Sequence, residues 1–501
     1  YYIIYYRNLN LKRELNKLGQ TVYSSIKFGT DGWRGIIGFD FNMANLSRVV
    51  VASCQELKFQ YSDRVKSKKI LIGYDRRFMA EHFAKSIIPF VNACGLEVIL
   101  SSSFVTTPSC SLYVRELNIL GALVITASHN PYNWLGLKIK NFQGSSVNEL
   151  FTKEVERRIK LGNITEPIKS NYQIEDIKQF HIEKINSFFD MQFILDRLRK
   201  MNIKVFIDAM HGSSAASINK LFHGNTQSVI KGIREEKDPY FSGNPPEPLI
   251  NYLDKLKNIL LQKKEEGFKT LGIVFDGDGD RIAVIDEKGR YCSTQVLLPY
   301  FINFLGKKAQ NNYPVIKTVS GSDVITKIAE GQNRNVFELP VGFKHIAEKM
   351  IKEKILIGGE ESGGIGFGHF LPERDALFAS IVLLDCIAKE EQYLCDSLDQ
   401  IQRNYGPSFY DRIDINFPDH SKKNALKNYI FDNIPKYICD YEVKSVSHQD
   451  GIKLRIDNNY WVLFRFSGTE PLLRLYCEAP SEDSLKDTLS WSKLFIKNII
   501  S

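Results

Sequence analysis

The sequence predicts an α/β protein of three or four domains. Its 501 residues are 43% hydrophobic, which is enough apolar material for several cores rather than one. Short apolar runs of strand length alternate with helical patterns, which is typical of βα-repeating domains. Four of these runs lead directly into polar loops, and three of the loops contain glycine. We therefore expect the strand ends to carry the function.

Composition limits the possible partners and location. The formal net charge of +8 comes from 66 basic and 58 acidic residues without a long polybasic run, so small anionic molecules are expected as partners rather than nucleic acid. Eight cysteines lack any C-x-x-C spacing, which argues against a zinc site and a disulfide framework. The longest uncharged stretch, 117–137, holds several polar residues that would be costly in lipid. We expect a soluble, cytoplasmic protein without a membrane span, as a monomer or small homo-oligomer.

The N-terminal part of the chain begins with a helical lead-in over residues 1–27. The loop at 28–35 follows, and its three glycines permit tight turns around Asp31 and Arg34. This loop either brings Arg34 to an anion or is a structural turn. Apolar strands are then expected at 69–74, 96–101 and 121–126.

The third of these strands ends in Thr-Ala-Ser-His-Asn-Pro at 126–131. Small polar residues and an Asn-Pro pair predict an exposed turn that presents Ser128 and His129. This is how a nucleophile is displayed, although a polar strand end in an ordinary sheet would look similar. Lys138 is close enough in sequence to share the same pocket, or is a solvated surface lysine.

A second α/β unit starts near residue 203, after a helical connection at 174–200, and contains the most informative motif. An apolar strand at 271–275 delivers Asp276, Asp278 and Asp280 at alternate positions, with glycines between them. Three such charges would repel each other, so a divalent cation is the simplest reason for them to converge. An EF-hand calcium loop is excluded, because Arg281 stands where that loop needs glycine and a strand precedes it. A solvent-exposed acidic turn is the remaining alternative.

Two further units carry loops suited to sugar and phosphate. In the third, Gly-Gly-Glu-Glu-Ser-Gly-Gly at 358–364 follows an apolar run and offers polar groups for carbohydrate hydroxyls, or forms a glycine-rich hairpin. The fourth is a smaller α+β unit from about residue 409. Its Ser-Gly-Thr turn at 467–469 lies between Arg465 and Arg474, which together suit a phosphate.

These four loops, in this order, resemble the α-D-phosphohexomutase superfamily of phosphoglucomutases and phosphomannomutases. The matching segments are 126–131, 276–281, 359–363 and 465–469. The resemblance implies four domains around a central cleft, three of them related α/β domains with mixed sheets and the last distinct. We place these domains at residues 28–190, 191–298, 299–405 and 406–501. One departure is Arg374-Asp375-Ala376, where the family often has Lys-Asp-Gly, so the glycine is missing from this chain.

The resemblance also implies roles for individual residues. Ser128 would be phosphorylated and would bind Mg²⁺ together with Asp276, Asp278 and Asp280. Further catalytic groups would be His129, Lys138 and Arg34. The residues that would bind substrate are Arg281, Lys344, Glu360, Ser362, Arg465, Ser467, Gly468, Thr469 and Arg474.

The implied reaction interconverts hexose 1- and 6-phosphates through a bisphosphorylated sugar, with glucose 1,6-bisphosphate as primer. A metal-bound phosphoserine is a good phosphoryl donor, because the cation neutralises charge that develops on the transferred group. We expect glucose phosphate as substrate. Phosphomannomutase and phosphoglucosamine mutase activities are the alternatives, together with a sugar-phosphate phosphatase and a catalytically silent binding protein. Glu361 is the carboxylate that a glucosamine ammonium would meet if it faces the cleft.

Overall fold

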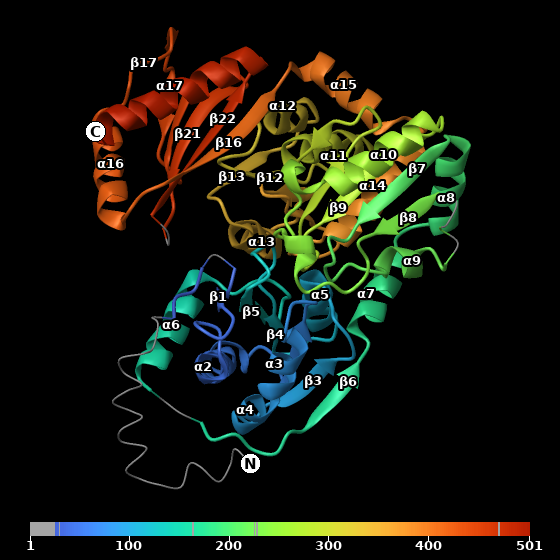
Figure 1. Ribbon diagram of the computed structural model, residues 1–501, viewed down its shortest axis with the longest axis vertical. Coiled ribbons are helices and arrows are strands. Elements are labelled where there is room, and N and C mark those ends of the chain that lie inside the picture. The colour runs from blue at the N-terminus through green and yellow to red at the C-terminus, as the bar shows by residue number, and fades with distance from the viewer. Residues whose placement is uncertain are drawn as a thin grey trace.

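The computed structural model describes residues 26–29, 31–162, 165–224, 226, 229–468 and 471–500. The predicted lead-in therefore lies almost entirely outside the described residues. Thr469 also lies outside them. The chain folds into four units, three with helix-flanked mixed sheets and a fourth built on an antiparallel sheet (Figure 1). This confirms the predicted fold class. All eight cysteines are unpaired in the structure.

Domain 1 is built on a six-stranded mixed sheet in the order β1-β5-β4-β2-β3-β6. The neighbouring strands β4, β2, β3 and β6 are parallel, whereas β5 and β1 form antiparallel pairs at the other edge. Its strands are β1 Trp33–Ile36, β2 Lys69–Tyr74, β3 Glu97–Ser101, β4 Gly121–Ile125, β5 Trp134–Asn141 and β6 Tyr172–Glu175. Its helices are α2 Met43–Tyr61, α3 Ala80–Ser86, α4 Ile88–Ala93, α5 Thr107–Glu116 and α6 Glu149–Lys160.

Domain 2 follows two connecting helices, α7 Ile177–Asn186 and α8 Met191–Lys200. Its sheet has the order β11-β10-β9-β7-β8, with β9, β7 and β8 parallel. The strands are β7 Ile203–Asp208, β8 Ile230–Ile233, β9 Lys269–Phe275, β10 Ile282–Ile285 and β11 Tyr291–Cys292. The helices are α9 Ser217–Leu221 and α10 Asp254–Glu265, with 3₁₀ turns at Phe241–Gly243 and Ile250–Tyr252.

Domain 3 has a four-stranded sheet in the order β13-β12-β14-β15. Its strands are β12 Val315–Thr318, β13 Val336–Leu339, β14 Ile357–Gly359 and β15 Ile365–Phe367. Its helices are α11 Thr294–Lys308, α12 Asp323–Gly331, α13 Phe343–Lys352, α14 Ala376–Glu390 and α15 Leu394–Tyr405. Because Ala376 begins α14 and Asp375 caps it by accepting from the Phe378 amide (2.9 Å), the missing glycine is no obstacle to this backbone.

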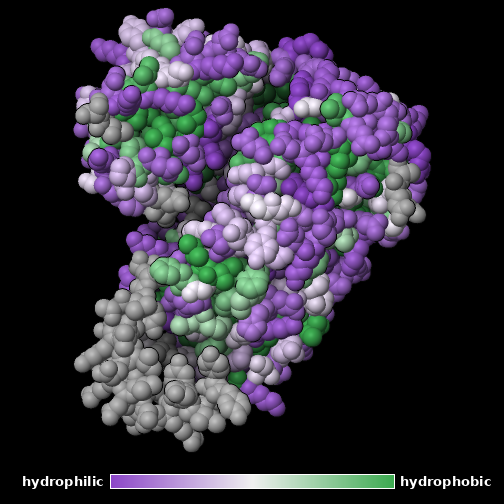
Figure 2. All heavy atoms as spheres, in the orientation of Figure 1, coloured by the Kyte–Doolittle hydropathy of each residue, from purple (hydrophilic) through white to green (hydrophobic). Residues whose placement is uncertain are grey.

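Domain 4 is an antiparallel sheet in the order β16-β22-β21-β20-β19. Its strands are β16 Phe409–Asn416, β19 Ser445–Ser447, β20 Ile452–Asp457, β21 Tyr460–Phe466 and β22 Leu472–Ala479, with a small ribbon of β17 Tyr437–Ile438 and β18 Tyr441–Glu442. Its helices are α16 His420–Asp432 and α17 Glu482–Ile500. Figure 2 shows the surface hollowed between this lobe and domain 1.

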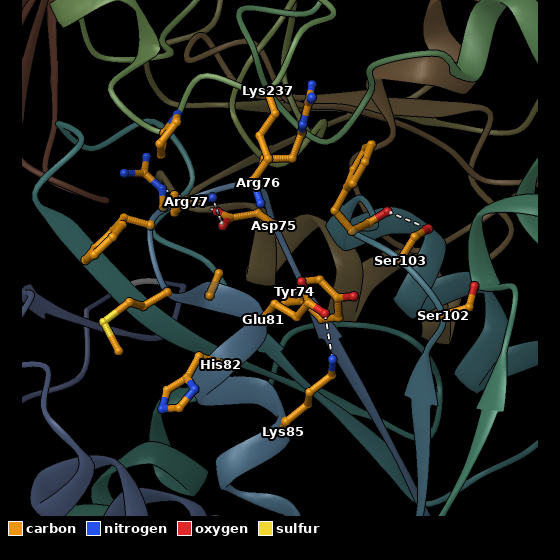
Figure 3. A pocket seen from close by; sticks show the side chains of 15 residues that line it. Tyr74, Asp75, Arg76, Arg77, Glu81, His82, Lys85, Ser102, Ser103 and Lys237 are labelled. Atoms are coloured by element: carbon orange, nitrogen blue, oxygen red, sulfur yellow. Dashed lines mark hydrogen bonds and ion pairs between the residues drawn. The ribbon is translucent and has the colours of Figure 1, made fainter.

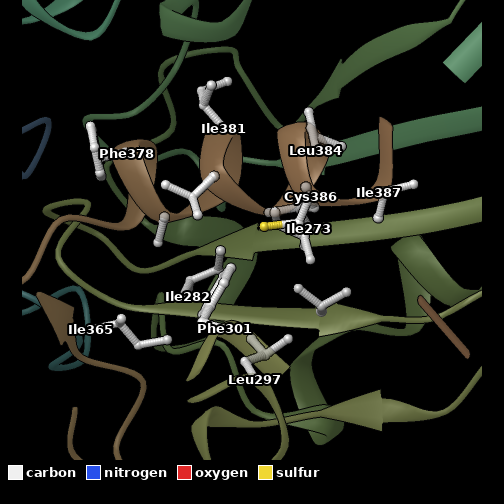
Figure 4. Packing of buried hydrophobic residues seen from close by; sticks show 14 of the residues in the cluster. Ile273, Ile282, Leu297, Phe301, Ile365, Phe378, Ile381, Leu384, Cys386 and Ile387 are labelled. Atoms are coloured by element: carbon white, nitrogen blue, oxygen red, sulfur yellow. The ribbon is translucent and has the colours of Figure 1, made fainter. Parts of the chain in front are cut away.

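Domains 2 and 3 share one hydrophobic core. Helix α14 of domain 3 places Phe378, Ile381 and Leu384 over Ile273 and Ile282, which come from strands β9 and β10 of domain 2 (Figure 4). Domains 1 and 4 have separate principal cores. The aspartate strand and the sugar loop are therefore carried by one continuously packed body. Within the described part of the chain, no helix is both long and apolar enough to cross a bilayer.

A buried lysine at the junction of domains 1 and 2 makes stability depend on pH. Lys178 lies with its Nζ 3.4 Å from the centroid of the Phe104 ring. Burial lowers the pKa of Lys178 to about 7, and the nearby cations Lys220 and Arg76 act in the same direction. Between that value and its ordinary pKa the unfolded chain binds more protons, so stability rises with pH through this window.

We expect Lys178→Met to raise the thermal unfolding midpoint near pH 6, where the folded protein must hold the buried charge. This gain should shrink towards about pH 10, because the lysine is then neutral in the folded state. The exposed Lys264→Met, which does not act on the pKa of Lys178, serves as the control. A gain that is equal at both pH values would show that the ammonium charge is not the cause.

Candidate active site

Ser128 lies in the loop that leaves strand β4. Its backbone is left-handed, with φ of 52°, and its amide donates to Thr126 Oγ1 at 2.9 Å. The Ser128 hydroxyl donates to Asp276 Oδ2 at 2.9 Å, so two domains meet at this oxygen. The prediction of an exposed turn was wrong, because only 1% of Ser128 is accessible. The aspartate loop on one side and an arginine on the other enclose it.

That arginine is Arg77, which the sequence analysis did not single out. Its guanidinium donates to the carbonyl oxygens of Ser128 (2.6 Å), Asn130 (2.6 Å) and Pro131 (2.8 Å), and so fixes the course of the serine loop. Asp75 pairs with it at 3.3 Å. Figure 3 shows both residues at the wall of a cavity of about 650 Å³ between domains 1 and 2. None of the predicted site residues lines this cavity.

The three predicted aspartates converge at the carboxyl end of strand β9. They are fully buried, and one ligand oxygen from each lies within 4.8 Å of the others. The left-handed Gly279 (φ 72°) allows the chain to turn between Asp278 and Asp280. In domain 1, the Thr107 hydroxyl donates to Asp278 Oδ2, and the Thr107 amide donates to the Asp278 carbonyl at 2.9 Å. The cluster is thus held by contacts from two domains.

The cluster has the properties of a cation site. Asp278 Oδ1 and Asp280 Oδ1 are buried and accept no hydrogen bond within the described structure. Burial raises the pKa of Asp276 well above its ordinary value, and the charges of Asp280 and Asp278 add to this effect. Orphaned carboxylate oxygens and mutual repulsion are both relieved by a divalent ion with oxygen ligands. The residues present therefore fit a metal ion.

The buried ammonium of Lys138 occupies the neighbouring position. Its Nζ lies 2.8 Å from both Asp278 Oδ2 and Asp280 Oδ2, and 2.7 Å from Asp31 Oδ2. Burial alone would lower the pKa of Lys138, but these carboxylates outweigh it and raise the pKa. Lys138 is therefore a charged member of the site and not a solvated surface residue.

His129 and Arg34 complete the serine side of the site. His129 Nδ1 lies 3.2 Å from Ser128 Oγ. Burial lowers the pKa of His129 well below its ordinary value, and the cations Arg281 and Arg34 reinforce the shift. A neutral imidazole, which can accept a proton, is therefore expected at neutral pH. Arg34 lies on strand β1 and donates to Asn130 Oδ1 at 2.5 Å, which links it to the serine loop.

The sugar loop is tied to the aspartates by Arg374. Its guanidinium donates to Glu360 Oε1 (2.7 Å), Asp280 Oδ2 (2.7 Å) and Asp31 Oδ2 (2.8 Å), so three domains meet at one side chain. The Ile282 amide also donates to the Gly363 carbonyl at 3.0 Å, next to Arg281. Glu360 is nearly buried, whereas Ser362 is partly accessible.

The remaining predicted residues form a second group near domain 4. Arg465 on β21 and Arg474 on β22 are cross-strand partners, and Arg465 donates to Asp450 Oδ2 at 2.9 Å. Ser467 lies after β21, and its carbonyl accepts from Lys423 Nζ at 2.6 Å, while Gly468 is exposed. Lys344 lies at the start of α13 and forms an ion pair with Glu149 of domain 1, with 3.7 Å between Lys344 Nζ and Glu149 Oε2.

Comparison with known proteins gives a consistent result. Models described as phosphoglucomutase/phosphomannomutase alpha/beta/alpha domains I, II and III and C-terminal domain match residues 25–164, 179–289, 295–405 and 426–489. A phosphoglucosamine/phosphogalactosamine mutase of Sulfurisphaera tokodaii is 27% identical, over 94% of this chain and 99% of its own. A phosphoglucosamine mutase of Methanocaldococcus jannaschii is also 27% identical, over 95% and 99%. A crystal structure of a putative phosphomannomutase from Thermus thermophilus superposes with a TM-score of 0.82 at 26% identity, covering 95% of this chain and all of that chain.

Proposed function

Because the chain belongs to the phosphoglucomutase/phosphomannomutase family, whose members are mutases, we propose that it interconverts the 1- and 6-phosphates of a hexosamine, with glucosamine phosphate preferred. The observation that carries the phosphoryl-transfer chemistry is the 2.9 Å contact between Ser128 and Asp276 at a buried aspartate cluster. The choice of sugar rests on the names of the two relatives described above. The motifs favoured glucose, and these relatives support the amino-sugar alternative better.

In this proposal Ser128 carries the transferable phosphoryl group. The bond between phosphorus and Ser128 Oγ breaks as a sugar hydroxyl oxygen bonds to phosphorus, and the resulting bisphosphate later returns its other phosphoryl group to Ser128. The sugar hydroxyl loses a proton as its oxygen bonds to phosphorus. Ser128 Oγ takes up a proton as its own bond to phosphorus breaks. His129 can pass it, because its neutral imidazole lies 3.2 Å from that oxygen.

Asp276, Asp278 and Asp280 would hold Mg²⁺ together with an oxygen on Ser128. When bound, the ion would neutralise the negative charge that develops on the transferred group. Lys138 keeps its ammonium beside Asp278 and Asp280, where it adds a fixed positive charge. Arg34 would contribute a second cation from the serine side of the site.

The two other loops would bind the substrate in either orientation. Glu360 and Ser362 are positioned on the loop proposed to contact the sugar hydroxyls, with Arg281 and Lys344 as further polar groups. The phosphate that is not reacting would be bound by Arg465, Ser467, Gly468, Thr469 and Arg474. Since one phosphate position is fixed and the sugar turns around, the same site serves both directions of the reaction.

The sugar preference can be measured directly. With glucose 1,6-bisphosphate as primer, we expect kcat/KM for glucosamine 1-phosphate to exceed that for glucose 1-phosphate and mannose 1-phosphate at least about tenfold, or about 1.4 kcal/mol. Discrimination of this size is available when the wrong epimer or substituent leaves a buried polar group unpaired. Equal values, or a higher value for glucose or mannose, would contradict the amino-sugar proposal and leave the mutase chemistry intact.

A phosphatase would use the same serine and aspartates with water as acceptor. The same assay separates it from a mutase, because release of inorganic phosphate is measured alongside isomer formation. We expect phosphate release at a small fraction of the isomerisation rate. Matching rates would favour the phosphatase.

A further inference from the structure

Domains 3 and 4 meet at an interface that contains two bridging carboxylates. Its apolar centre is formed by Val319 of domain 3 with Trp461, Leu463 and Tyr476 of domain 4. Asp450 lies in the turn between β19 and β20 and contacts Arg465 of the proposed phosphate site, and Glu361 lies in the sugar loop. Neither has a role in the reaction as described so far.

Asp450 joins the phosphate arginine to domain 3. One oxygen, Asp450 Oδ2, accepts from Arg465 Nε at 2.9 Å and from the backbone amide of Val341 at 2.8 Å. Val341 belongs to the loop that leads to Lys344 at the start of α13. The position of Arg465 is therefore fixed relative to domain 3 as well as relative to its own strand.

The turn that holds Asp450 is shaped to fit against Arg465. Gly451, which follows Asp450, has φ of 111°, a conformation that other residues rarely adopt. A Cβ on Gly451 would lie 2.5 Å from the carbonyl oxygen of Phe464 and 3.1 Å from the Cα of Arg465. The absence of a side chain thus lets the Asp-Gly turn between β19 and β20 pack directly on the backbone of β21. This packing is independent of the carboxylate contacts and supports the same arrangement.

Glu361 makes a second link between the two domains. Asp450 belongs to domain 4 and contacts domain 3, whereas Glu361 belongs to domain 3 and contacts domain 4. Its Oε2 accepts from the hydroxyl of Ser320 at 2.6 Å, and its Oε1 accepts from the hydroxyl of Tyr476 at 3.2 Å. Tyr476 lies on β22, two residues from Arg474. The carboxylate considered as a partner for a sugar ammonium is thus engaged between domains 3 and 4. The sugar loop and the phosphate strands are connected from both sides.

From this geometry we propose that Asp450 is a positioning residue for the distal phosphate of the substrate, acting through Arg465. The proposal rests on the proposed function, since it presumes that Arg465 binds a sugar phosphate. An arginine has several rotatable bonds, and ordering them when a ligand binds costs free energy. Because Asp450 accepts a hydrogen bond from one of the five guanidinium donors, the Arg465 side chain is already ordered before the ligand binds. A forked bond to phosphate remains compatible with that anchor.

A double-mutant cycle read out by calorimetry tests the proposal. Asp450→Ala, Arg465→Ala and the double variant are titrated with glucosamine 6-phosphate and glucose 6-phosphate. We expect Arg465→Ala to weaken binding roughly ten- to a hundredfold. Asp450→Ala should weaken it roughly three- to tenfold, and the double variant should bind no more weakly than Arg465→Ala. The control is Asp457→Ala, a surface carboxylate of domain 4 paired with Lys444 at 3.1 Å, which should bind as the wild type does.

Two results would overturn the proposal: unchanged affinity in Asp450→Ala, or losses that multiply in the double variant. Asp450→Asn provides a second test if the alanine variant is unstable. Its amide oxygen can still accept from Val341 but lacks the charge, so we expect a smaller loss of affinity than in Asp450→Ala. A loss that is confined to one sugar would also count against a phosphate role, because both sugars carry the same 6-phosphate.

The two proposals fail separately in this experiment. The ratio of wild-type affinities for the two sugars reports on the amino-sugar preference, whereas the loss common to both reports on Asp450. Slow hydrolysis of phosphoserine without sugar adds a further control, since it needs Ser128 and the aspartates but no distal phosphate. It should be unchanged in Asp450→Ala. A parallel fall in hydrolysis would indicate general structural damage and contradict the positioning role.

Discussion

Ser128→Ala is expected to lower mutase turnover by roughly four orders of magnitude or more, because in the proposed mechanism Ser128 carries the phosphoryl group between the two half-reactions. The fold should persist. The lost hydroxyl donates one hydrogen bond, to Asp276, and its removal costs about 1 to 3 kcal/mol. A coupled assay for isomer formation measures turnover, and circular dichroism with thermal melting measures folding.

The exposed Ser102→Ala is the matched control and should retain full activity. Appreciable turnover in Ser128→Ala with all priming bisphosphate supplied would show that the phosphoryl group passes through a different residue. Loss of activity accompanied by unfolding would be uninformative about transfer, so the melting curve is recorded on the same sample as the assay.

Asp276→Asn is expected to lower turnover by roughly three orders of magnitude or more, equivalent to about 4 kcal/mol of lost stabilisation of the transition state. The substitution keeps the shape of the side chain. Its oxygen can still accept from the amides of Asp280 and Arg281, and its amide can donate to Ser128 Oγ. Activity and Mg²⁺ affinity should fall together when the variant is titrated with the ion.

The same variant should not be less stable than the wild type when metal is absent. The raised pKa of Asp276 means that folding without metal disfavours its charged form, and asparagine carries no charge. We therefore expect an equal or higher thermal midpoint in chelator, with Asp457→Asn as the surface control. A strongly lowered midpoint, or normal activity without a titratable Mg²⁺ requirement, would be inconsistent with a metal-binding aspartate.

Local pattern was sufficient to predict where strands β4 and β9 end. The runs before Ser128 and Asp276 are strands β4 and β9, and both loops lie at carboxyl ends of parallel strands. The two strands belong to different sheets, and the packing of domain 1 against domain 2 brings residues 148 positions apart into contact. The sequence spacing of the aspartates also predicted a cluster, because one glycine between each pair leaves the chain free to turn.

Contacts between domains could not be predicted from single segments. Arg374 joins residues of three domains, and the carbonyl partners of Arg77 lie 51 to 54 positions away within domain 1, so neither set of partners can be predicted from the neighbouring residues. The burial of Ser128 and Lys138 was missed for the same reason, since other domains cover them. The one local signal was the Asp-Arg-Arg run at 75–77, which follows strand β2 as the serine loop follows β4.

The shared core of domains 2 and 3 also lies beyond what periodicity can reveal. Helix α14 is apolar on nearly all sides, because it packs against strands of its own domain and of domain 2. Pattern alone predicts that such a helix is buried, but it does not identify the surfaces that cover it. Likewise, Glu361 was considered as a cleft carboxylate, whereas Ser320 and Tyr476 engage it.

The central claim is that Ser128 carries the transferable phosphoryl group, and peptide mass spectrometry tests it most directly. The wild-type protein is incubated with glucose 1,6-bisphosphate and Mg²⁺, digested, and searched for a gain of one phosphoryl group. The account predicts modification of the peptide that contains Ser128, and its disappearance when hexose monophosphate is added in excess. Phosphorylation of a different residue, with Ser128 unmodified in an active enzyme, would contradict it.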